Sequence, residues 1–258
     1  MPKFCANLTM LFKEVDFLDR FALAAKAGFK GVEFLFPYEW DKDEVLEKLT
    51  ENGLEMVLFD LPAGHWGIGE RGLACLPDRV NEFQEGVGLA IEYASVLKCP
   101  RLTCLAGIPT VNVTDDQRFE TLVANVRYAA EETEKVGSKL MVEAINSHDM
   151  PGFSLTGTKQ VANLLNKVGH PNAYMQYDIY HMQVMEGNLT QTIGQNIDKI
   201  GHMQIADVPG RHEPGTGEIN FDNLFRSIDK MGYKGWIGCE YNPSGATEAS
   251  LKWIKKYL

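Results

Sequence analysis

Eight short apolar segments recur along the chain, and a segment with helical periodicity follows each of them. A chain that alternates strand and helix in this way is typical of an α/β fold, in which helices pack outside a parallel sheet. Eight such units are the number that a closed parallel barrel needs, so the pattern predicts a single (β/α)8 barrel of the TIM type. The expected strands are Lys3–Leu8, Gly31–Phe36, Glu55–Phe59, Arg101–Leu105, Lys139–Ala144, Ala173–Asp178, Ile200–Ile205 and Trp236–Glu240.

The expected helices are Val15–Ala27, Asp43–Asn52, Pro77–Leu97, Asp115–Val136, Thr158–Val168, a segment around Asn188–Asn196, Asn220–Met231 and Thr247–Tyr257. No break in composition and no low-complexity linker divides the eight units, so we expect one domain over residues 1–258. The alternative is a doubly wound sheet. That fold needs a glycine-rich phosphate-binding turn that runs from an early strand directly into a helix, and we find none in that position.

Composition and charge restrict the class of partner. The chain has 258 residues, of which 45% are hydrophobic, so it can bury a full core. Its net charge of −10 argues against a nucleic-acid partner, because binding to a phosphate backbone normally requires a basic patch or stripe. We therefore expect a small-molecule substrate, which local cations can still bind if it is anionic.

The cysteines and the first residues indicate a compartment. The five cysteines are an odd number without zinc-like spacing, and we interpret them as reduced core thiols. The first three residues lead into FCANL without the apolar core of a signal peptide, and no later apolar run is long enough to span a bilayer. We therefore expect a cytoplasmic protein that contacts no membrane. A homo-oligomer is compatible with such a barrel.

Polar side chains stand at the ends of otherwise apolar strands. The last four strands end in Glu143, Asp178, Gln204 and Glu240, and the second strand contains Glu33. The active site of a TIM barrel lies at the C-terminal strand ends, so these side chains are expected to meet. Several buried carboxylates need a cation or protons to neutralise them, and an oxygen-rich set suits Mg²⁺ or Mn²⁺. The sequence therefore predicts a divalent-metal site formed by Glu143, Asp178, Gln204 and Glu240. Taken alone, any one of these residues is explained by helix capping or by pairing with a lysine.

Two histidines are candidates for substrate binding. His181 follows Asp178 with the spacing D-x-x-H, which puts it just past the strand end. His202 points to the same face of its strand as Gln204, because strand side chains alternate. For His181 the structural alternative is a histidine at the start of a helix whose hydrogen bonds are made locally. For His202 it is a hydrogen-bonded residue of the barrel core.

Two arginines are further candidates. Arg71 and Arg211 lie in glycine-rich loops on the expected catalytic side, where a guanidinium group can bind a substrate carboxylate through two hydrogen bonds. For each of them the alternative is a surface arginine in a solvated loop. Trp66, in the first of these loops, is either part of a lid over the site or packing beneath the loop.

Five segments together resemble the hydroxypyruvate isomerase family: LPAGHWGIGERGLACLP, VEAIN, QYDIYHMQ, GHMQIADVPGRHEPGTGEIN and GWIGCEY. The resemblance covers nearly the whole chain and places it among the xylose isomerase-like TIM barrels. It implies an aldose–ketose type isomerisation with a divalent cation held at the strand ends. It also implies that Glu143 and Glu240 are the acid/base pair, and that Glu143, Asp178, Gln204 and Glu240 bind the metal.

The resemblance implies a reaction as well. We expect interconversion of hydroxypyruvate and tartronate semialdehyde through an enediolate, with two carboxylates acting as base and acid. The family also includes 2-oxo-tetronate isomerases, which these motifs do not separate from hydroxypyruvate isomerases. Three competing functions are a sugar 3-epimerase that returns the proton to the same carbon, a metal-dependent nuclease, and a metabolite-binding barrel without catalysis. Few histidines and the acidic charge argue against the nuclease.

Overall fold

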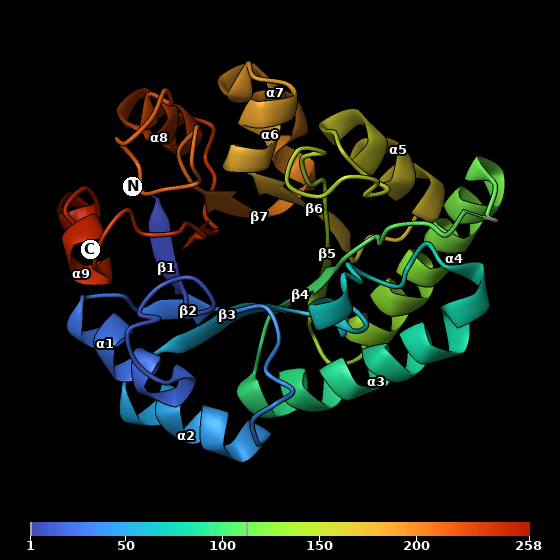
Figure 1. Cartoon of the computed structure of the whole chain (residues 1–258), viewed down its shortest axis with the longest axis horizontal. Helices are drawn as coiled ribbons and strands as arrows, with labels where there is room; N and C mark the ends of the chain where they lie inside the picture. Colours follow the sequence, from blue (N-terminus) through green and yellow to red (C-terminus); the bar gives the residue numbers. More distant parts are fainter. Residues whose placement is uncertain (1, 112) are drawn as a thin grey trace.

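The computed structural model describes residues 2–111 and 113–258, and its eight parallel strands close into a barrel in sequence order (Figure 1). Strand β8 completes the ring by pairing with β1. The predicted (β/α)8 barrel is therefore confirmed. The strands are β1 Lys3–Asn7, β2 Gly31–Glu33, β3 Glu55–Asp60, β4 Arg101–Cys104, β5 Lys139–Glu143, β6 Ala173–Asp178, β7 Ile200–Ile205 and β8 Trp236–Cys239.

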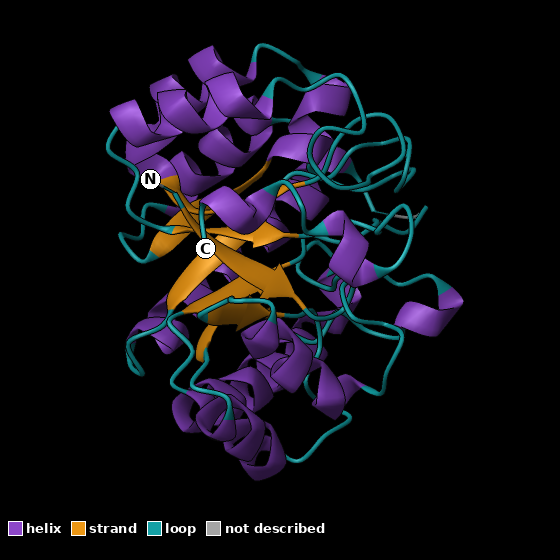
Figure 2. Cartoon of the chain, turned by 90° about the vertical axis from the view of Figure 1, so that its left-hand side faces the viewer, coloured by secondary structure: helices purple, strands orange, loops and turns teal. Residues whose placement is uncertain are grey.

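Helices surround the barrel, and the longer loops gather at the ends to which the strands point (Figure 2). The α-helices are α1 Arg20–Lys26, α2 Lys42–Glu51, α3 Val80–Leu97, α4 Asp115–Glu134, α5 Thr158–Val168, α6 Ile179–Met185, α7 Leu189–Asn196, α8 Phe221–Lys230 and α9 Thr247–Ser250. Short 3-10 helices are η1 Phe17–Asp19, η2 Trp66–Ile68, η3 Pro77–Arg79, η4 Ile197–Lys199 and η5 Ile254–Lys256. No helix in the described ranges combines the length and apolar character needed to cross a membrane.

Several elements differ from the prediction. Helix α1 begins at Arg20 instead of Val15, after the 3-10 helix η1. Strand β2 ends at Glu33 instead of Phe36, and its register to β3 shifts between Val32 and Glu33. Helix α6 was not predicted; it begins where the Asp178 side chain accepts the backbone N–H of Tyr180 at 2.7 Å. The last helix was predicted too long, since α9 ends at Ser250. Beyond it the chain turns, and the rings of Trp253 and Tyr257 each lie 5.3 Å from the ring of Phe4 on β1.

The long loop after β3 has the glycine spacing of a dinucleotide-binding turn at residues 67–72, but not its structure. These glycines lie in and after η2, and α3 begins only at Val80. The Glu70 carboxylate instead closes the loop on itself, because it accepts the backbone N–H of His65 at 2.6 Å and pairs with Arg79. The loop therefore offers no helix N-terminus to a phosphate, in agreement with the barrel.

The barrel interior changes from apolar to polar along the strands. Met141 belongs to a buried apolar cluster with Cys5, Val57 and Leu58, whereas Glu143, two residues further along β5, reaches the cavity at the strand end. Strand side chains alternate, so residues two apart share the interior face at successive heights. The polar end of the interior is thus the C-terminal end, where the sequence predicted the site.

Candidate active site

A small cavity of about 70 Å³ lies at the C-terminal ends of the strands. It is lined by the polar side chains of Asp60, Glu143, Gln176, His181, Gln204, Arg211 and Glu240 and by Met10, Leu35, Trp66, Leu105, Ile145 and Met150. Asp178 stands beside it, with Oδ2 at 3.6 Å from His181 Nε2. The four residues of the predicted metal set therefore meet at one place, and His181 and Arg211 lie with them.

Three carboxylates of this group are almost fully buried. Glu143, Asp178 and Glu240 are 5%, 1% and 7% exposed. Glu143 Oε1 and Asp178 Oδ2 have no hydrogen-bond partner among the residues that the structure describes. Glu240 is better satisfied, because Arg211 Nη2 donates to its Oε2 at 2.8 Å. A buried carboxylate oxygen without a donor is costly, so the two orphaned oxygens need a proton or a cation.

Burial and mutual repulsion shift the acidity of these groups. Burial is the largest cause that raises the pKa of Glu143 well above its ordinary value, followed by the charges of Glu240 and Asp178. Burial likewise raises the pKa of Glu240 to about 8, against the opposing effect of the Arg211 cation. Two carboxyl groups with raised pKa values in one cavity are candidates for proton transfer, because perturbed acidity of this kind is typical of catalytic groups.

These shifts predict how the stability of the metal-free protein depends on pH. The folded-state pKa of Glu240 is about 8, above the unfolded value of about 4.3, so the native state binds more protons between these values. The contribution of Glu240 to the free energy of unfolding is therefore fully present below about pH 4.3 and is lost as the pH rises towards about 8. We expect the melting temperature of the chelator-treated protein to fall from about pH 5 to about pH 8. A Glu240→Gln variant should show a shallower fall, and an equal slope in both proteins would contradict the assignment.

His181 presents an N–H group to the carboxylates. The Oδ1 atom of Asn146 accepts the backbone N–H groups of His148 and Asp149 at 3.0 and 2.8 Å, so its Nδ2 must face His181 Nδ1, at 2.7 Å. Nδ1 is then an acceptor and the proton lies on Nε2, which is 3.6 Å from Asp178 Oδ2 and 3.9 Å from Glu143 Oε1. Burial lowers the pKa of His181 to about 4, so the ring is neutral at neutral pH. His181 is therefore a neutral donor toward the acidic group.

Removing the Asn146 amide should affect the reaction through His181. In an Asn146→Ala variant nothing holds Nδ1 as an acceptor, and either nitrogen of His181 can carry the proton. We expect kcat/KM to fall by about 10- to 100-fold, the usual cost of losing such an orienting partner. Nitrogen NMR of the imidazole should show mixed tautomers. The matched control is Asn172→Ala at the other end of β6, where the amide donates to the backbone oxygens of Ala130 and Ser138. A control as slow as Asn146→Ala would mean that lost stability, not the tautomer, explains the effect.

The residues around the orphaned oxygens fit a divalent cation. Ligand atoms of Glu143, Asp178 and His181 all lie within 4.8 Å of one another. His181 is not a ligand in its present tautomer, because the nitrogen that faces the carboxylates carries the proton. The remaining oxygen donors are those of the predicted set, with Gln204 as the amide member. An all-oxygen set of this kind suits Mg²⁺ or Mn²⁺.

His202 lies deeper in the barrel than predicted for a substrate contact. It is fully buried, its Nε2 is 2.7 Å from Glu33 Oε2, and it is not among the residues that line the cavity. Gln204, two residues further along β7, does line the cavity. The geometry thus supports the alternative for His202, a hydrogen-bonded residue of the barrel core.

The loop after β7 is built to carry Arg211. The carboxylate of Asp207 accepts backbone N–H groups from Val208, Gly215, Gly217 and Ile219 at 2.9 to 3.1 Å, which folds the loop around it. At position 217 a Cβ atom would lie 2.0 Å from the Val208 oxygen, so glycine is required there. Arg211 has a φ of 57° within this loop, and its Nε atom is buried without a partner among the described residues.

Arg71 takes a different position. Its Nη1 donates to the backbone oxygens of Trp66 and Glu70 at 2.9 and 2.7 Å, and the guanidinium lies 4.1 Å from the centre of the Trp66 ring. It is absent from the residues lining the cavity, whereas Trp66 is present. Arg71 therefore contacts Trp66, which forms part of the cavity wall, and does not line the cavity itself.

Sequence reasoning missed Asp60, Gln176 and Asn146. Asp60 ends β3 and is 6% exposed, and burial raises its pKa well above the ordinary value. The strand-end argument applied to β5 through β8 would have found it on β3 as well. Gln176 precedes Asp178 by two residues, so alternation places both on one face. Asn146 lies in a loop, and nothing in its local sequence distinguishes it from an ordinary turn residue.

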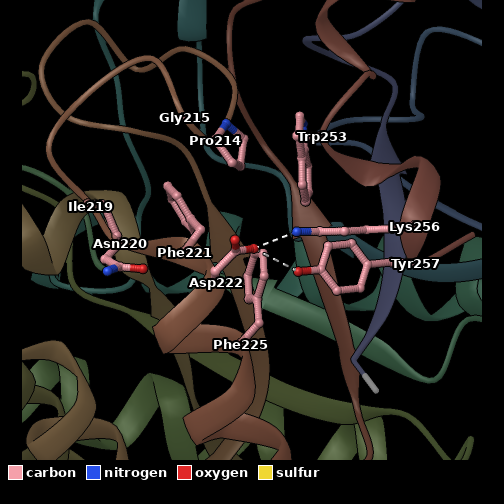
Figure 3. Close-up of a pocket in the computed structure, with 10 residues that line it drawn as sticks. All are labelled: Pro214, Gly215, Ile219, Asn220, Phe221, Asp222, Phe225, Trp253, Lys256 and Tyr257. Carbon is pink, nitrogen blue, oxygen red and sulfur yellow. Dashed lines mark hydrogen bonds and ion pairs between the residues drawn. The ribbon is translucent and has the colours of Figure 1, made fainter.

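Larger hollows occur on the surface, but they lack this chemistry. The one drawn in Figure 3 has a volume of about 320 Å³ and lies between the loop after β7, α8 and the C-terminal residues. Its walls are mostly aromatic and apolar, and its charged groups, Asp222 and Lys256, bind each other at 2.6 Å. The small cavity is therefore the candidate active site.

Comparison with known proteins agrees with this geometry. The family model described as xylose isomerase-like TIM barrel matches residues 21–257. This chain belongs to the xylose isomerase-like TIM barrel family. The fold and the resemblance found in the sequence are both confirmed by this match and by the barrel itself.

Named members of this family resemble the chain over its full length. A protein named hydroxypyruvate isomerase from Escherichia coli is 53% identical over 257 residues, covering 100% of both chains. A protein named 2-oxo-tetronate isomerase from Pectobacterium atrosepticum is 45% identical, covering 100% of this chain and 98% of that one. The prediction of an isomerase, which came from the family resemblance, is confirmed at the level of the family.

Solved structures extend the likeness. A Brucella melitensis protein named AP endonuclease, family 2, superposes with a TM-score of 0.97 at 44% identity, covering 100% of this chain and 99% of that chain. An L-ribulose 3-epimerase superposes with a TM-score of 0.79 at 20% identity, covering 99% and 86%. The second likeness, at this low identity, shows the shared barrel only.

Proposed function

We propose that this isomerase interconverts hydroxypyruvate and tartronate semialdehyde. The observation that carries the proposal is the pair of buried glutamates, Glu143 and Glu240, which face one small cavity and both have a pKa above that of an ordinary glutamate. The relative named hydroxypyruvate isomerase, at 53% identity over the full length, supports the choice of substrate.

The reaction moves a carbonyl group between neighbouring carbons of one molecule. A proton leaves C3 of hydroxypyruvate and another is delivered to C2, while the hydroxyl proton on O3 is exchanged for one on O2. The enediolate between them carries negative charge on both oxygens. One glutamate takes the proton from C3 and the other delivers a proton to C2, so no redox partner is consumed. Carboxyl groups on β5 and after β8 approach the substrate from different strands.

A divalent cation, Mg²⁺ or Mn²⁺, would be held by Glu143, Asp178, Gln204 and Glu240. When bound, it would supply positive charge beside the two substrate oxygens on which negative charge develops. The orphaned oxygens of Glu143 and Asp178 support this assignment. Because protons and the cation compete for the same carboxylates, we expect metal affinity to rise with pH.

Three further side chains have roles in this scheme. Arg211 lines the cavity and would bind the substrate carboxylate through its guanidinium group. His181 offers its Nε2–H to a substrate oxygen. Trp66 lines the cavity and would limit the access of water to it.

A specific observation favours a second candidate, a 2-oxo-tetronate isomerase. Relatives with that name are 45% and 44% identical to this chain over its whole length. The two reactions need the same acid/base pair and differ in the substrate by one hydroxymethylene group. The endonuclease name of the Brucella protein raises a nuclease as a third possibility, which the net charge of −10 opposes.

One assay tests these proposals. The purified protein is incubated in deuterated water with hydroxypyruvate or with 2-oxo-tetronate, before and after EDTA, and with Mg²⁺ or Mn²⁺ restored, while NMR follows the products. We expect tartronate semialdehyde with deuterium at C2, loss of turnover with EDTA, and recovery with metal. Faster turnover of 2-oxo-tetronate would move the assignment to the second candidate. Deuterium exchange without a shifted carbonyl would indicate an epimerase.

A further inference from the structure

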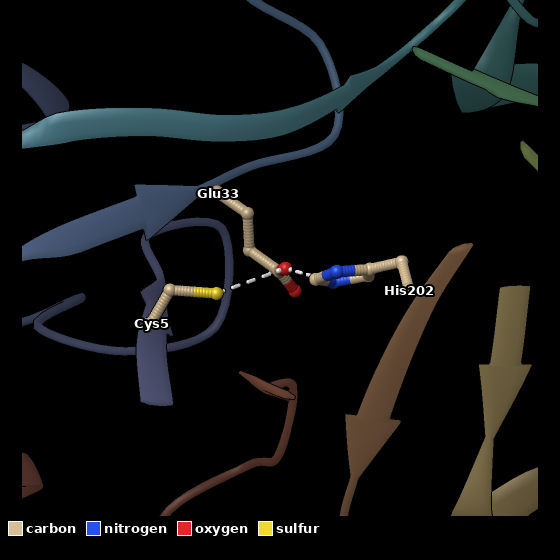
Figure 4. A group of neighbouring side chains, drawn as sticks. All are labelled: Cys5, Glu33 and His202. Atoms are coloured by element: carbon tan, nitrogen blue, oxygen red, sulfur yellow. Dashed lines mark hydrogen bonds and ion pairs between the residues drawn. The ribbon is translucent and has the colours of Figure 1, made fainter. Parts of the chain in front are cut away.

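A chain of polar side chains lies beneath the cavity, and Glu33 stands at its lower end. The Glu33 carboxylate is fully buried and has four hydrogen-bond donors around its two oxygens. Figure 4 shows Cys5 and His202, whose Sγ and Nε2 atoms lie 3.3 and 2.7 Å from Oε2. Asn7 Nδ2 and Gln204 Nε2 donate to Oε1 at 3.0 and 2.9 Å. With every neighbour donating, Glu33 acts only as an acceptor.

The rest of the chain, which we call the amide relay, consists of Gln204, Gln176 and Thr103. Gln204 must turn its NH₂ group to Glu33, so its Oε1 atom points the other way and accepts from Gln176 Nε2 at 2.7 Å. Gln176 Oε1 in turn accepts from Thr103 Oγ1 at 2.7 Å. All donors in the relay therefore point toward Glu33. Because Glu33 only accepts hydrogen bonds, it determines the direction in which the oxygen and the NH₂ group of Gln204 and Gln176 point.

The barrel makes room for this carboxylate. A Cβ atom at position 238 on β8 would lie 2.1 Å from Glu33 Oε1, so glycine is needed there. Asn7 is oriented too, because its Oδ1 accepts the backbone N–H of Thr9 at 3.1 Å and its Nδ2 lies between Glu33 Oε1 and Glu240 Oε1, 3.0 and 3.5 Å away. Glu33 thus contacts a neighbour of Glu240 and Gln204 itself, although it does not line the cavity.

We propose that Glu33 is a positioning residue that keeps the amide oxygen of Gln204, and not its nitrogen, directed at the cation. The inference rests on the proposed metal set, because only an oxygen can bind the cation. A glutamine at position 33 can donate as well as accept, so the relay can reverse and turn the Gln204 NH₂ group upward. A positively polarised NH₂ group opposes metal binding.

The test compares Mn²⁺ binding by calorimetry in the unaltered protein, Glu33→Gln and the exchanged double variant Glu33→Gln/Gln204→Glu. We expect Glu33→Gln to weaken Mn²⁺ binding by about 10- to 100-fold, the usual effect of removing an orienting partner. In the double variant residue 204 is a glutamate, so one carboxylate oxygen can accept from the glutamine at position 33 while the other faces the cation. This variant should recover most of the Mn²⁺ affinity. Cys104→Ser, a polar change in the apolar cluster outside the relay, should leave the affinity within about 2-fold.

Each outcome decides the inference. Unchanged Mn²⁺ affinity in Glu33→Gln, with only a lower melting temperature, would reduce Glu33 to a structural residue and overturn the proposal. If the single variant does not fold, the double variant decides, and lack of recovered binding contradicts the proposal. Absence of Mn²⁺ binding by the unaltered protein overturns it as well. Failure of the proposed reaction is separate, since it would appear as binding of Mn²⁺ without turnover of either substrate.

Discussion

We expect a Glu240→Gln variant to lose at least about 10³-fold in kcat, and a Glu143→Gln variant to lose a similar factor, because each would remove one of the two groups that we propose transfer the protons. Glutamine keeps the size of the side chain and can still accept the hydrogen bond from Arg211, so the barrel remains folded. Stopped activity with an intact circular dichroism spectrum is the expected result, measured on hydroxypyruvate with saturating Mn²⁺.

The two glutamates can then be distinguished. The variant that retains the base still exchanges the C3 proton of the substrate with deuterated solvent, although it forms no product. The variant that lacks the base exchanges nothing. Glu55→Gln, an exposed glutamate at the start of β3, is the matched control and should keep full activity. Near-normal turnover in either site variant would exclude that residue from the acid/base pair.

The metal-free Glu240→Gln protein should also be more stable at about pH 8 than the unaltered protein. The amide cannot ionise, so the folded state no longer carries the penalty of burying a charge at this position. Loss of activity together with a gain in melting temperature is a signature that simple misfolding does not produce.

Replacing Arg211 with Gln has the second largest expected effect. Its guanidinium pairs with Glu240 at 2.8 Å and lies 3.8 Å from Asp178 Oδ2, and we propose that it also binds the substrate carboxylate. We expect kcat/KM to fall by at least about 10²-fold, mainly through KM, since a contact to the substrate carboxylate is made equally in the ground state and the transition state.

Arg71→Gln separates the two arginines that the sequence left equivalent. Its guanidinium contacts Trp66 and backbone oxygens instead of the cavity, so kcat/KM should fall less than about 10-fold. Equal losses in Arg71→Gln and Arg211→Gln would contradict the assignment of Arg211 to the substrate carboxylate. The comparison uses steady-state kinetics on both candidate substrates.

Much of the fold and the site could be predicted because both depend on periodicity. Alternation of strand and helix determines a closed barrel, and the strand ends then bring Glu143, Asp178, Gln204 and Glu240 to one rim. The alternation of side chains along a strand also predicts which side chains face the barrel interior, but not how far along the barrel axis each one lies. His202 shares its face with Gln204 and lies one step lower, which removes it from the cavity.

Other features depend on contacts that no local pattern contains. The tautomer of His181 is set by Asn146, whose direction is determined by the backbone of its own loop. The difference between Arg71 and Arg211 arises from how each loop folds, around Glu70 and Asp207 respectively. The short helix α9 follows from aromatic packing on Phe4, at the opposite end of the sequence.

The missing side chain at position 238 has a consequence for how this barrel can change over generations. A side chain there collides with the Glu33 carboxylate, at 2.1 Å from its Oε1. Position 238 can therefore gain a side chain only together with a shorter residue at position 33. A shorter residue at position 33 alone would lose the orienting contact to Gln204, so these two positions are expected to change as a pair.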